Sequence, residues 1–317
     1  MENVTFHDHK PDTLSLYDAV VQGLSKRQKS IPPKFFYDKR GSELFDQICQ
    51  QPEYYLPTVE RRMLEQNAAE IADLAGRGRV LIEPGAGSAS KVRLLLDALQ
   101  PSAFVPMDIS FEYLKSSATA LAEEYPWLSI RAACVDYTHS LPVPENVPPG
   151  SRLLFFPGSS LGNFNKREAC EFLRLVHNTL GRDGMLLIGI DTKKNHGLLN
   201  AAYNDAAGLT AEFNLNLLHR VQNELNADLD PNNFAHKAFY NNEAGRIEMH
   251  LISKFKHTLR IDGHAFEFEE GECLHTENSY KYSPDEFISM ASLNGFQSLR
   301  CWVDDQGLFA IYLLQSE

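Results

Sequence analysis

One stretch limits the fold of this chain more than any other: a short apolar run, a glycine-rich loop and an amphipathic helix in direct succession. Residues 79–83 (Arg-Val-Leu-Ile-Glu) predict a buried strand, residues 84–91 (Pro-Gly-Ala-Gly-Ser-Ala-Ser-Lys) a loop, and residues 92–99 a helix with one apolar face. Gly85 and Gly87 let the backbone turn tightly and let a ligand approach it closely. The stretch predicts an open α/β sheet with a ligand at the carboxyl end of this strand.

The same alternation continues along the first half of the chain. Strands are expected over residues 104–109, 130–136, 152–157 and 185–191, with amphipathic helices over 59–75, 111–124 and 165–180. Buried strands that alternate with helices predict a parallel sheet covered on both faces. Near the end, residues 299–303 and 308–314 predict two strands joined by a tight turn, which forces them to pair antiparallel.

The stretch between these regions follows another pattern. It combines a helical pattern over residues 203–225 with alternating strands and a hairpin signal at Asp262-Gly263. At about 150 residues per domain, 317 residues fit two domains. We therefore expect an α/β, doubly wound, Rossmann-like domain over residues 1–194 and 281–317, with an α+β domain inserted over 195–280. A parallel sheet that ends in an antiparallel hairpin is typical of S-adenosylmethionine-dependent methyltransferases rather than dinucleotide dehydrogenases.

Composition excludes several classes of protein. The 30 basic and 42 acidic residues give a net charge of −12, so a nucleic acid is not expected as a partner. No stretch approaches the 18 or so apolar residues that would span a membrane. The 5 cysteines are widely spaced and lack a C-x-x-C motif, which disfavours a disulfide framework or a zinc site and favours the cytoplasm.

Acidic residues follow three successive strands. Asp108 ends the second strand, where a carboxylate can accept both ribose hydroxyls of a nucleoside, and Asp136 ends the third, where it can bind the adenine amino group. Glu83 precedes the glycine loop, a position suited to the cationic end of S-adenosylmethionine. Ser90 replaces the third glycine of a dinucleotide-binding motif, which weakens the alternative of a nicotinamide cofactor.

Several segments resemble one family, the histidine Nα-methyltransferases of ergothioneine biosynthesis. They are Phe-Phe-Tyr-Asp-Lys-Arg-Gly-Ser-Glu-Leu-Phe-Asp-Gln-Ile at 35–48, Gln-Pro-Glu-Tyr-Tyr-Leu-Pro-Thr at 51–58, Gly-Ser-Ser-Leu-Gly-Asn at 158–163, residues 203–216, Arg-Ile-Glu-Met at 246–249 and Thr-Glu-Asn-Ser at 276–279. The resemblance runs from about residue 20 to residue 317 and includes the inserted domain. It implies a cytoplasmic, monomeric enzyme without a metal that converts L-histidine, through its mono- and dimethyl forms, to the trimethyl betaine hercynine.

The resemblance also assigns residues to the two ligands. S-adenosylmethionine would contact a set drawn mostly from the predicted sheet: Tyr37, Glu83, Gly85, Gly87, Lys91, Asp108, Asp136 and Tyr137. Tyr54, Asn163 and Tyr203 would hold the substrate carboxylate, and Tyr37 and Asn163 would hold the reacting amine. Glu277 and Ser279 would bind the imidazole, with Met249 packed against the ring.

Two other interpretations remain open at this stage. One is a methyltransferase for another amine, such as a tryptophan derivative or a thiohistidine. The other is a protein that senses S-adenosylmethionine or histidine without turnover. Glu277 favours histidine over an indole, because an indole ring needs no buried carboxylate at this place.

Overall fold

The computed structural model describes residues 3–9 and 15–317. They form two compact units, and each unit is assembled from separate stretches of chain. The first unit holds residues 3–9, 58–192 and 282–317, and the second holds residues 15–57 and 193–281.

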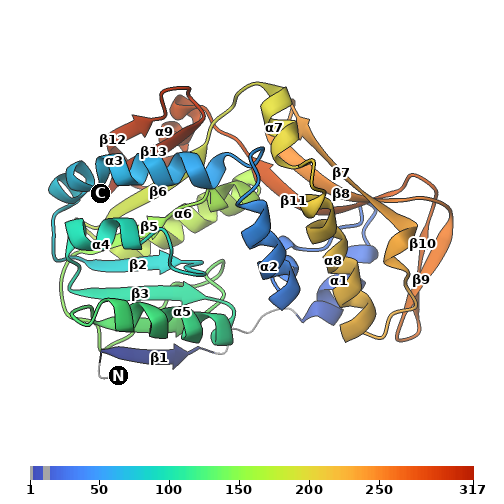
Figure 1. Cartoon of the computed structure of the whole chain (residues 1–317), viewed down its shortest axis with the longest axis horizontal. Coiled ribbons are helices and arrows are strands. Elements are labelled where there is room, and N and C mark those ends of the chain that lie inside the picture. Colours follow the sequence, from blue (N-terminus) through green and yellow to red (C-terminus); the bar gives the residue numbers. More distant parts are fainter. Residues whose placement is uncertain (1–2, 10–14) are drawn as a thin grey trace. The chain divides into compact units, whose positions relative to one another are not determined.

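An eight-stranded sheet forms the core of the first unit (Figure 1). Its strands lie in the order β1 (Val4–Asp8), β4 (Ile130–Cys134), β3 (Ala103–Asp108), β2 (Val80–Pro84), β5 (Arg152–Phe156), β6 (Met185–Asp191), β13 (Phe309–Ser316) and β12 (Phe296–Val303). The first six strands are parallel, and the pairs β6–β13 and β13–β12 are antiparallel. The predicted doubly wound sheet with a terminal antiparallel hairpin is confirmed.

Helices connect these strands. They are α3 (Leu56–Ala75), α4 (Arg93–Leu99), α5 (Phe111–Glu124), α6 (Lys166–Leu180) and α9 (Pro284–Ser292), with a short 3-10 turn η2 (Ser160–Asn163) before α6. Asn165 and Ser283 begin α6 and α9 with capping boxes, in which side chain and backbone satisfy one another reciprocally. These caps fix where the loops after β5 and before α9 end.

The second unit combines helices with antiparallel strands. Its helices are α1 (Leu16–Leu24), α2 (Lys39–Ile48), α7 (His196–Ala202) and α8 (Leu209–Glu224), with 3-10 turns η1 (Pro33–Phe36) and η3 (Pro231–Asn233). A three-stranded sheet has the order β11 (Cys273–Tyr280), β8 (Arg246–Ser253), β7 (Phe234–Asn241). The hairpin expected at Asp262-Gly263 joins β9 (His257–Ile261) to β10 (His264–Phe268).

The helical pattern over residues 203–225 is interrupted in the structure. The Asp205 carboxylate accepts hydrogen bonds from the backbone N–H groups of Leu209 and Thr210, both at 2.8 Å, and Gly208 adopts a left-handed φ of +76°. The side chain of Asp205 therefore satisfies the first N–H groups of α8, which begins only at Leu209. Tyr203, the first residue of the predicted helical pattern, lies outside α8: it follows the last residue of α7 and is buried.

The division into domains differs from the prediction in one long segment and by one or two residues at the two ends of the inserted stretch. Residues 15–57 were expected to belong with the sheet, but they pack in the second unit. Their apolar side chains, such as Val20, Phe36 and Leu44, join one buried cluster with those of α8 and β8. Residues 29–31 also run beside β11, where the Ile31 N–H donates to the His275 carbonyl at 3.1 Å. The amphipathic pattern gives the apolar face of a helix but not the element that covers it.

A bulge in β11 decides which of its side chains share a face. His275 pairs with His250 of β8, but Glu277 already pairs with Met249, so Thr276 is an extra residue. The Thr276 hydroxyl donates to the Asn214 side chain at 2.8 Å, an interaction that holds the bulge in place. Beyond the bulge, Glu277 and Ser279 lie on the same face as Met249.

Candidate cofactor and substrate sites

The glycine loop after β2 lies at the carboxyl edge of the parallel strands. Gly85 and Gly87 adopt φ values of +69° and +52°, in the left-handed region that favours glycine. A Cβ atom on Gly85 would lie 3.3 Å from the Tyr137 ring, so a larger residue there would also press on that ring. Gly85, Gly87 and Tyr137, three residues predicted to bind the cofactor, therefore lie together.

Asp108 and Asp136 occupy neighbouring strand ends at the same edge. Asp108 accepts hydrogen bonds from the backbone N–H of Gly87 at 3.1 Å and of Ser110 at 3.0 Å, so it ties the glycine loop to β3. Burial raises the pKa of Asp108, and these backbone donors oppose that shift. Asp136 accepts from the N–H and the hydroxyl of Thr138, at 3.1 and 2.5 Å. Both carboxylates are thus held in fixed orientations at the edge where open α/β sheets bind ligands.

Glu83 is a buried acid with one oxygen atom that has no hydrogen-bond partner. Its side chain is 2% exposed, and its Oε2 atom is buried without a hydrogen-bond partner in the structure. Burial raises the pKa of Glu83 to about 8, while the charge of Lys91 acts in the opposite direction. A cationic ligand placed here would satisfy the carboxylate, which fits the ammonium group of S-adenosylmethionine.

Glu60 of α3 is a functional candidate that the sequence analysis missed. It is 1% exposed and accepts hydrogen bonds from Lys91 Nζ at 2.5 Å and from the Gly158 N–H at 2.8 and 3.0 Å. Gly189 in the middle of β6 leaves room for it, because a Cβ atom there would come within 2.1 Å of the Glu60 carboxylate. The sequence spacing could have identified Glu60 as a buried acid, because it lies four residues before Leu64 on the buried face of α3.

Glu60→Gln is expected to weaken S-adenosylmethionine binding about 10-fold. The neutral amide cannot form the ion pair that positions Lys91. Its N–H₂ group would also face the N–H donors of Lys91 and Gly158, so that no hydrogen bond forms between them. Calorimetric titration of the cofactor measures the effect. Glu65→Gln, on the exposed side of α3, is the matched control and should bind the cofactor normally. Unchanged affinity together with a lower melting temperature would restrict Glu60 to a structural role.

In the second unit, the predicted imidazole ligands lie on adjacent strands. Glu277 pairs with Met249 across β11 and β8, and Ser279 follows two residues later on the same face. Met249 is 2% exposed and Ser279 is 4% exposed, whereas Glu277 is half-buried. Burial raises the pKa of Glu277 to about 7, and the charge of Lys281 opposes that shift. The carboxyl group therefore changes charge near neutral pH.

Lys281 extends this row and was not predicted. It follows Ser279 by two positions, is 1% exposed, and donates from Nζ to Ser279 Oγ at 2.9 Å and to the Tyr203 hydroxyl at 3.2 Å. Tyr203 in turn donates to Ser279 Oγ at 2.8 Å. The alternation of strand residues could have identified Lys281, because Glu277, Ser279 and Lys281 follow one another at every second position.

An aromatic wall lies next to this row. The Tyr54 ring meets the Tyr203 ring edge to face at 5.9 Å, and Phe45 lies 6.3 Å from Tyr54 and 5.7 Å from Tyr37. Burial is the main cause that raises the pKa of Tyr54 well above its ordinary value, and nearby Tyr203 and Glu277 add to the shift. Tyr54 thus stays neutral and can donate its proton to an anion. Aromatic faces also suit a quaternary ammonium product.

The predicted residues therefore fall into two groups. Glu83, Gly85, Gly87, Lys91, Asp108, Asp136 and Tyr137 lie in the first unit, and Tyr54, Tyr203, Met249, Glu277 and Ser279 lie in the second. Two predicted residues lie in a different unit from the other residues predicted for the same ligand. Tyr37, expected at the cofactor and the amine, belongs to the second unit, whereas Asn163, expected at the substrate, ends η2 in the first unit.

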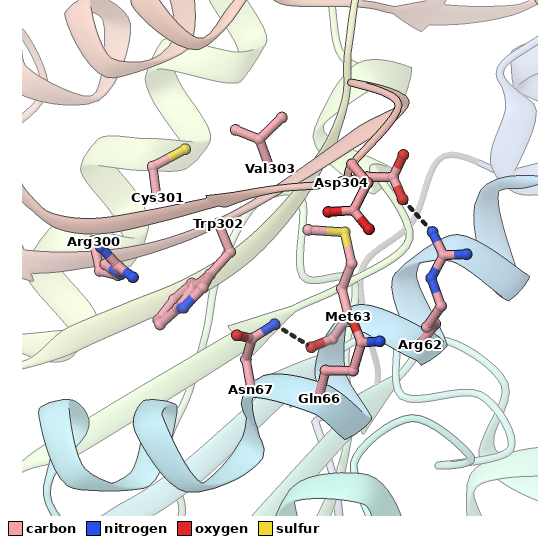
Figure 2. Close-up of a pocket in the computed structure, with 10 residues that line it drawn as sticks. Arg62, Met63, Gln66, Asn67, Arg300, Cys301, Trp302, Val303 and Asp304 are labelled. Atoms are coloured by element: carbon pink, nitrogen blue, oxygen red, sulfur yellow. Dashed lines mark hydrogen bonds and ion pairs between the residues drawn. The ribbon is translucent and has the colours of Figure 1, made fainter.

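A surface pocket of about 300 Å³ lies elsewhere in the first unit, between α3 and β12 (Figure 2). Its lining is largely polar and includes the ion pair of Arg62 with Asp304 and the Trp302 ring. None of the predicted site residues contributes to it. We therefore do not connect this pocket with either ligand.

The other face of β8 and β11 carries a polar cluster. The Glu248, His250 and His275 side chains offer potential metal-ligand atoms within 4.8 Å of one another. Glu248 is already bound by Arg246 at 2.7 and 2.9 Å, and the His250 ring stacks on Phe239 with an interplanar angle of 11°. His250 Nε2 lies 3.0 Å from Glu248 Oε2, so the contacts of Glu248 describe an arginine–carboxylate–imidazole network.

The fold and the strand-end residues define the class of the protein. A parallel sheet closed by an antiparallel pair, with a glycine loop and acidic residues at its carboxyl edge, is the architecture of an S-adenosylmethionine-dependent methyltransferase. The model of one family, described as histidine-specific, S-adenosylmethionine-dependent methyltransferases, matches residues 16–316. The chain belongs to this family, and it is an enzyme that takes its methyl groups from S-adenosylmethionine.

Individual relatives agree with this assignment. The chain is 39% identical over 300 residues to the histidine N-alpha-methyltransferase of Mycolicibacterium smegmatis, covering 93% of this chain and 92% of that protein. It is 38% identical to the Mycobacterium tuberculosis protein of the same name, with 95% and 94% coverage. A solved mitomycin 7-O-methyltransferase, 12% identical, has the same fold with a TM-score of 0.50, over 89% of this chain and 59% of that one.

Proposed function

We propose that this enzyme transfers three methyl groups to the α-amino group of L-histidine and forms hercynine, the first step of ergothioneine biosynthesis. The observation that carries the proposal is the pair Glu277 and Ser279, which present a carboxylate and a hydroxyl on one face beside Met249. An imidazole ring has two nitrogens that need such partners. Family membership and the names of the mycobacterial relatives support the same substrate.

Residues at the carboxyl edge of the parallel strands support the proposed binding of S-adenosylmethionine. The unpartnered Oε2 of Glu83 would take the ammonium group, Asp108 the ribose hydroxyls and Asp136 the adenine amino group. Lys91, fixed by Glu60, would attract the carboxylate of the cofactor. When bound, the cofactor supplies an electrophilic methyl group on a sulfonium.

The residues of the second unit would orient the amino acid. Glu277 and Ser279 would hold the ring, and Tyr54 and Tyr203 would donate to the carboxylate. The family resemblance assigns Asn163 to that carboxylate as well. Tyr37 and Asn163 are assigned by the family resemblance to hold the amine by hydrogen bonds, directly or through water, and the amine proton would pass to water. Alignment of the nitrogen lone pair with the breaking bond is the main requirement, and no strong base is needed to release a proton from an alkyl ammonium.

A turnover assay tests the proposal directly. Purified protein is mixed with S-adenosylmethionine and L-histidine, and products are followed by mass spectrometry, with tryptophan and mono- and dimethylhistidine as parallel substrates. Trimethylhistidine from all three histidine forms is expected. Methylation of tryptophan but not of histidine would keep the cofactor and overturn the substrate, and no methyl transfer to any amine would favour a sensor.

We further propose that the enzyme acts as a cytoplasmic monomer on free histidine, without a nucleic acid or membrane partner. The net charge of −12 supports the absence of nucleic acid. In the described residues, no helix has the length and apolar character needed to cross a bilayer, and the 5 cysteines form no disulfide. Light scattering on the purified protein should give the mass of one chain, 35.8 kDa.

A further inference from the structure

Lys281 places a buried charge where an apolar residue would pack at lower cost. Its side chain is 1% exposed, and its Nζ atom donates to Ser279 Oγ and the Tyr203 hydroxyl and lies 5.1 Å from the centre of the Tyr203 ring. Burying an ammonium group is unfavourable unless its donors are used. Here they are used on the hydroxyl groups of two residues proposed to bind the substrate.

The hydrogen bonds at Ser279 determine what it can offer a ligand. A serine hydroxyl has two acceptor lone pairs and one proton. Lys281 donates to Ser279 Oγ at 2.9 Å and Tyr203 donates to it at 2.8 Å, which together occupy both lone pairs. Ser279 can then interact with a further group only by donating its own proton.

Glu277 offers a ligand a hydrogen-bond acceptor, whereas Ser279 offers a donor. An ionised carboxylate only accepts hydrogen bonds. A ring held by Glu277 and Ser279 must therefore give an N–H to the first and a bare nitrogen lone pair to the second. A neutral imidazole meets this demand in one of its two tautomers. An imidazolium ion does not, because both of its nitrogens carry protons and its charge would lie near the Lys281 ammonium.

We propose that Lys281 is a positioning residue that sets the specificity of the substrate site, because it makes Ser279 a hydrogen-bond donor and so selects one neutral tautomer of the imidazole ring. The inference rests on the proposed function, since it takes the ring of histidine as the ligand of Glu277 and Ser279. It adds a requirement on the protonation state and tautomer of that ring.

Binding to the unmodified enzyme tests the inference first. Calorimetry with S-adenosylhomocysteine present compares L-histidine with its 1,2,4-triazole analogue, whose ring has the same shape but is far less basic. The charged and titratable groups around Ser279 include Lys281, Tyr203, Tyr54 and Glu277. Glu277 gains a proton over this pH range, and the triazole, which stays neutral, measures how much affinity that proton removes. Between pH 8 and 5.5, histidine is expected to lose about 10-fold more affinity than the triazole, because its ring, with a pKa of about 6.5, becomes charged. Equal losses would overturn the inference.

Lys281→Met tests the residue itself. Without the ammonium, one lone pair of Ser279 becomes available, so Ser279 can also accept from a charged ring. We expect kcat/KM for histidine at pH 8 to fall about 20-fold, mainly through KM, and the pH-dependent difference between the two ligands to shrink to within about 2-fold. Lys237→Met, an exposed lysine on β7, is the matched control and should leave both unchanged.

The outcomes separate the inference from the proposed function. If Lys281→Met weakens histidine but keeps the full difference between histidine and the triazole, Lys281 serves packing alone and the inference fails. If the unmodified enzyme does not methylate histidine at all, the proposed function fails instead. The comparison on the unmodified enzyme remains decisive even where the variant does not fold.

Discussion

Glu277→Gln should raise the KM for histidine about 100-fold and change the KM for S-adenosylmethionine by less than about 2-fold. The amide keeps the shape of the side chain but loses the charge that accepts the ring N–H, and a hydrogen bond to a charged group contributes roughly 1.5–3 kcal/mol. Initial rates at varied histidine and cofactor concentrations measure both constants. Equal effects on the two constants would show that Glu277 is not a ligand of the imidazole.

Glu267→Gln is the matched control, since Glu267 is an exposed acid on β10 of the same unit. A second readout comes from the unliganded protein. The pKa of Glu277 is raised from 4.5 to about 7, so the ionised carboxylate opposes folding above pH 7 and not below pH 4.5. Glu277→Gln should therefore stabilise the protein at pH 8, by about 1–2 kcal/mol because part of the side chain still meets solvent, and less at pH 6.

Asp108→Asn should reduce the affinity for S-adenosylmethionine about 100-fold. The ribose hydroxyls lose a charged acceptor, and the new amide can turn its N–H₂ group toward the backbone N–H of Gly87 or Ser110, which Asp108 now accepts at 3.1 and 3.0 Å. Calorimetric titration with the cofactor and with S-adenosylhomocysteine measures the loss.

Asp97→Asn is the control for this experiment, because Asp97 is exposed on α4 of the same unit. It should bind the cofactor like the unmodified enzyme. If Asp108→Asn also bound the cofactor normally, the carboxylate would serve only to hold the glycine loop against β3. A parallel nicotinamide titration should show no binding to any of the three proteins.

The sheet could be predicted because its signals are local. Val80–Pro84 and Met185–Asp191 are fully buried strands, and they appear in the sequence as continuous apolar runs next to amphipathic helices. The edge strand β1 was not predicted. Val4–Asp8 is only partly buried and has no apolar run, and its place is fixed by pairing with β4, some 126 positions away along the chain.

The sequence did not predict the two residues that hold other site residues in place. Glu60 and Lys281 touch no ligand in the proposed scheme, and they are recognised by what they hold, Lys91 and Ser279. Their spacing places each on a buried face, but spacing does not say that a charged residue there has a partner. The segment 15–57 illustrates the same limit, because its sequence does not say which unit its apolar side chains pack in.

The extra residue at Thr276 has a consequence for how this substrate site can change in evolution. Substitutions at Glu277 or Ser279 replace one chemical group and leave the strand as it is. Deletion of Thr276 would remove the bulge and leave Glu277 paired with Met249, but it would also remove the hydroxyl that donates to the Asn214 side chain. Loss of one residue beyond the bulge would instead bring Asn278 and Tyr280 to the face that Glu277 and Ser279 now occupy. A change in strand length beyond Thr276 can therefore replace every side chain of the recognition surface at once, whereas a substitution at Glu277 or Ser279 replaces one.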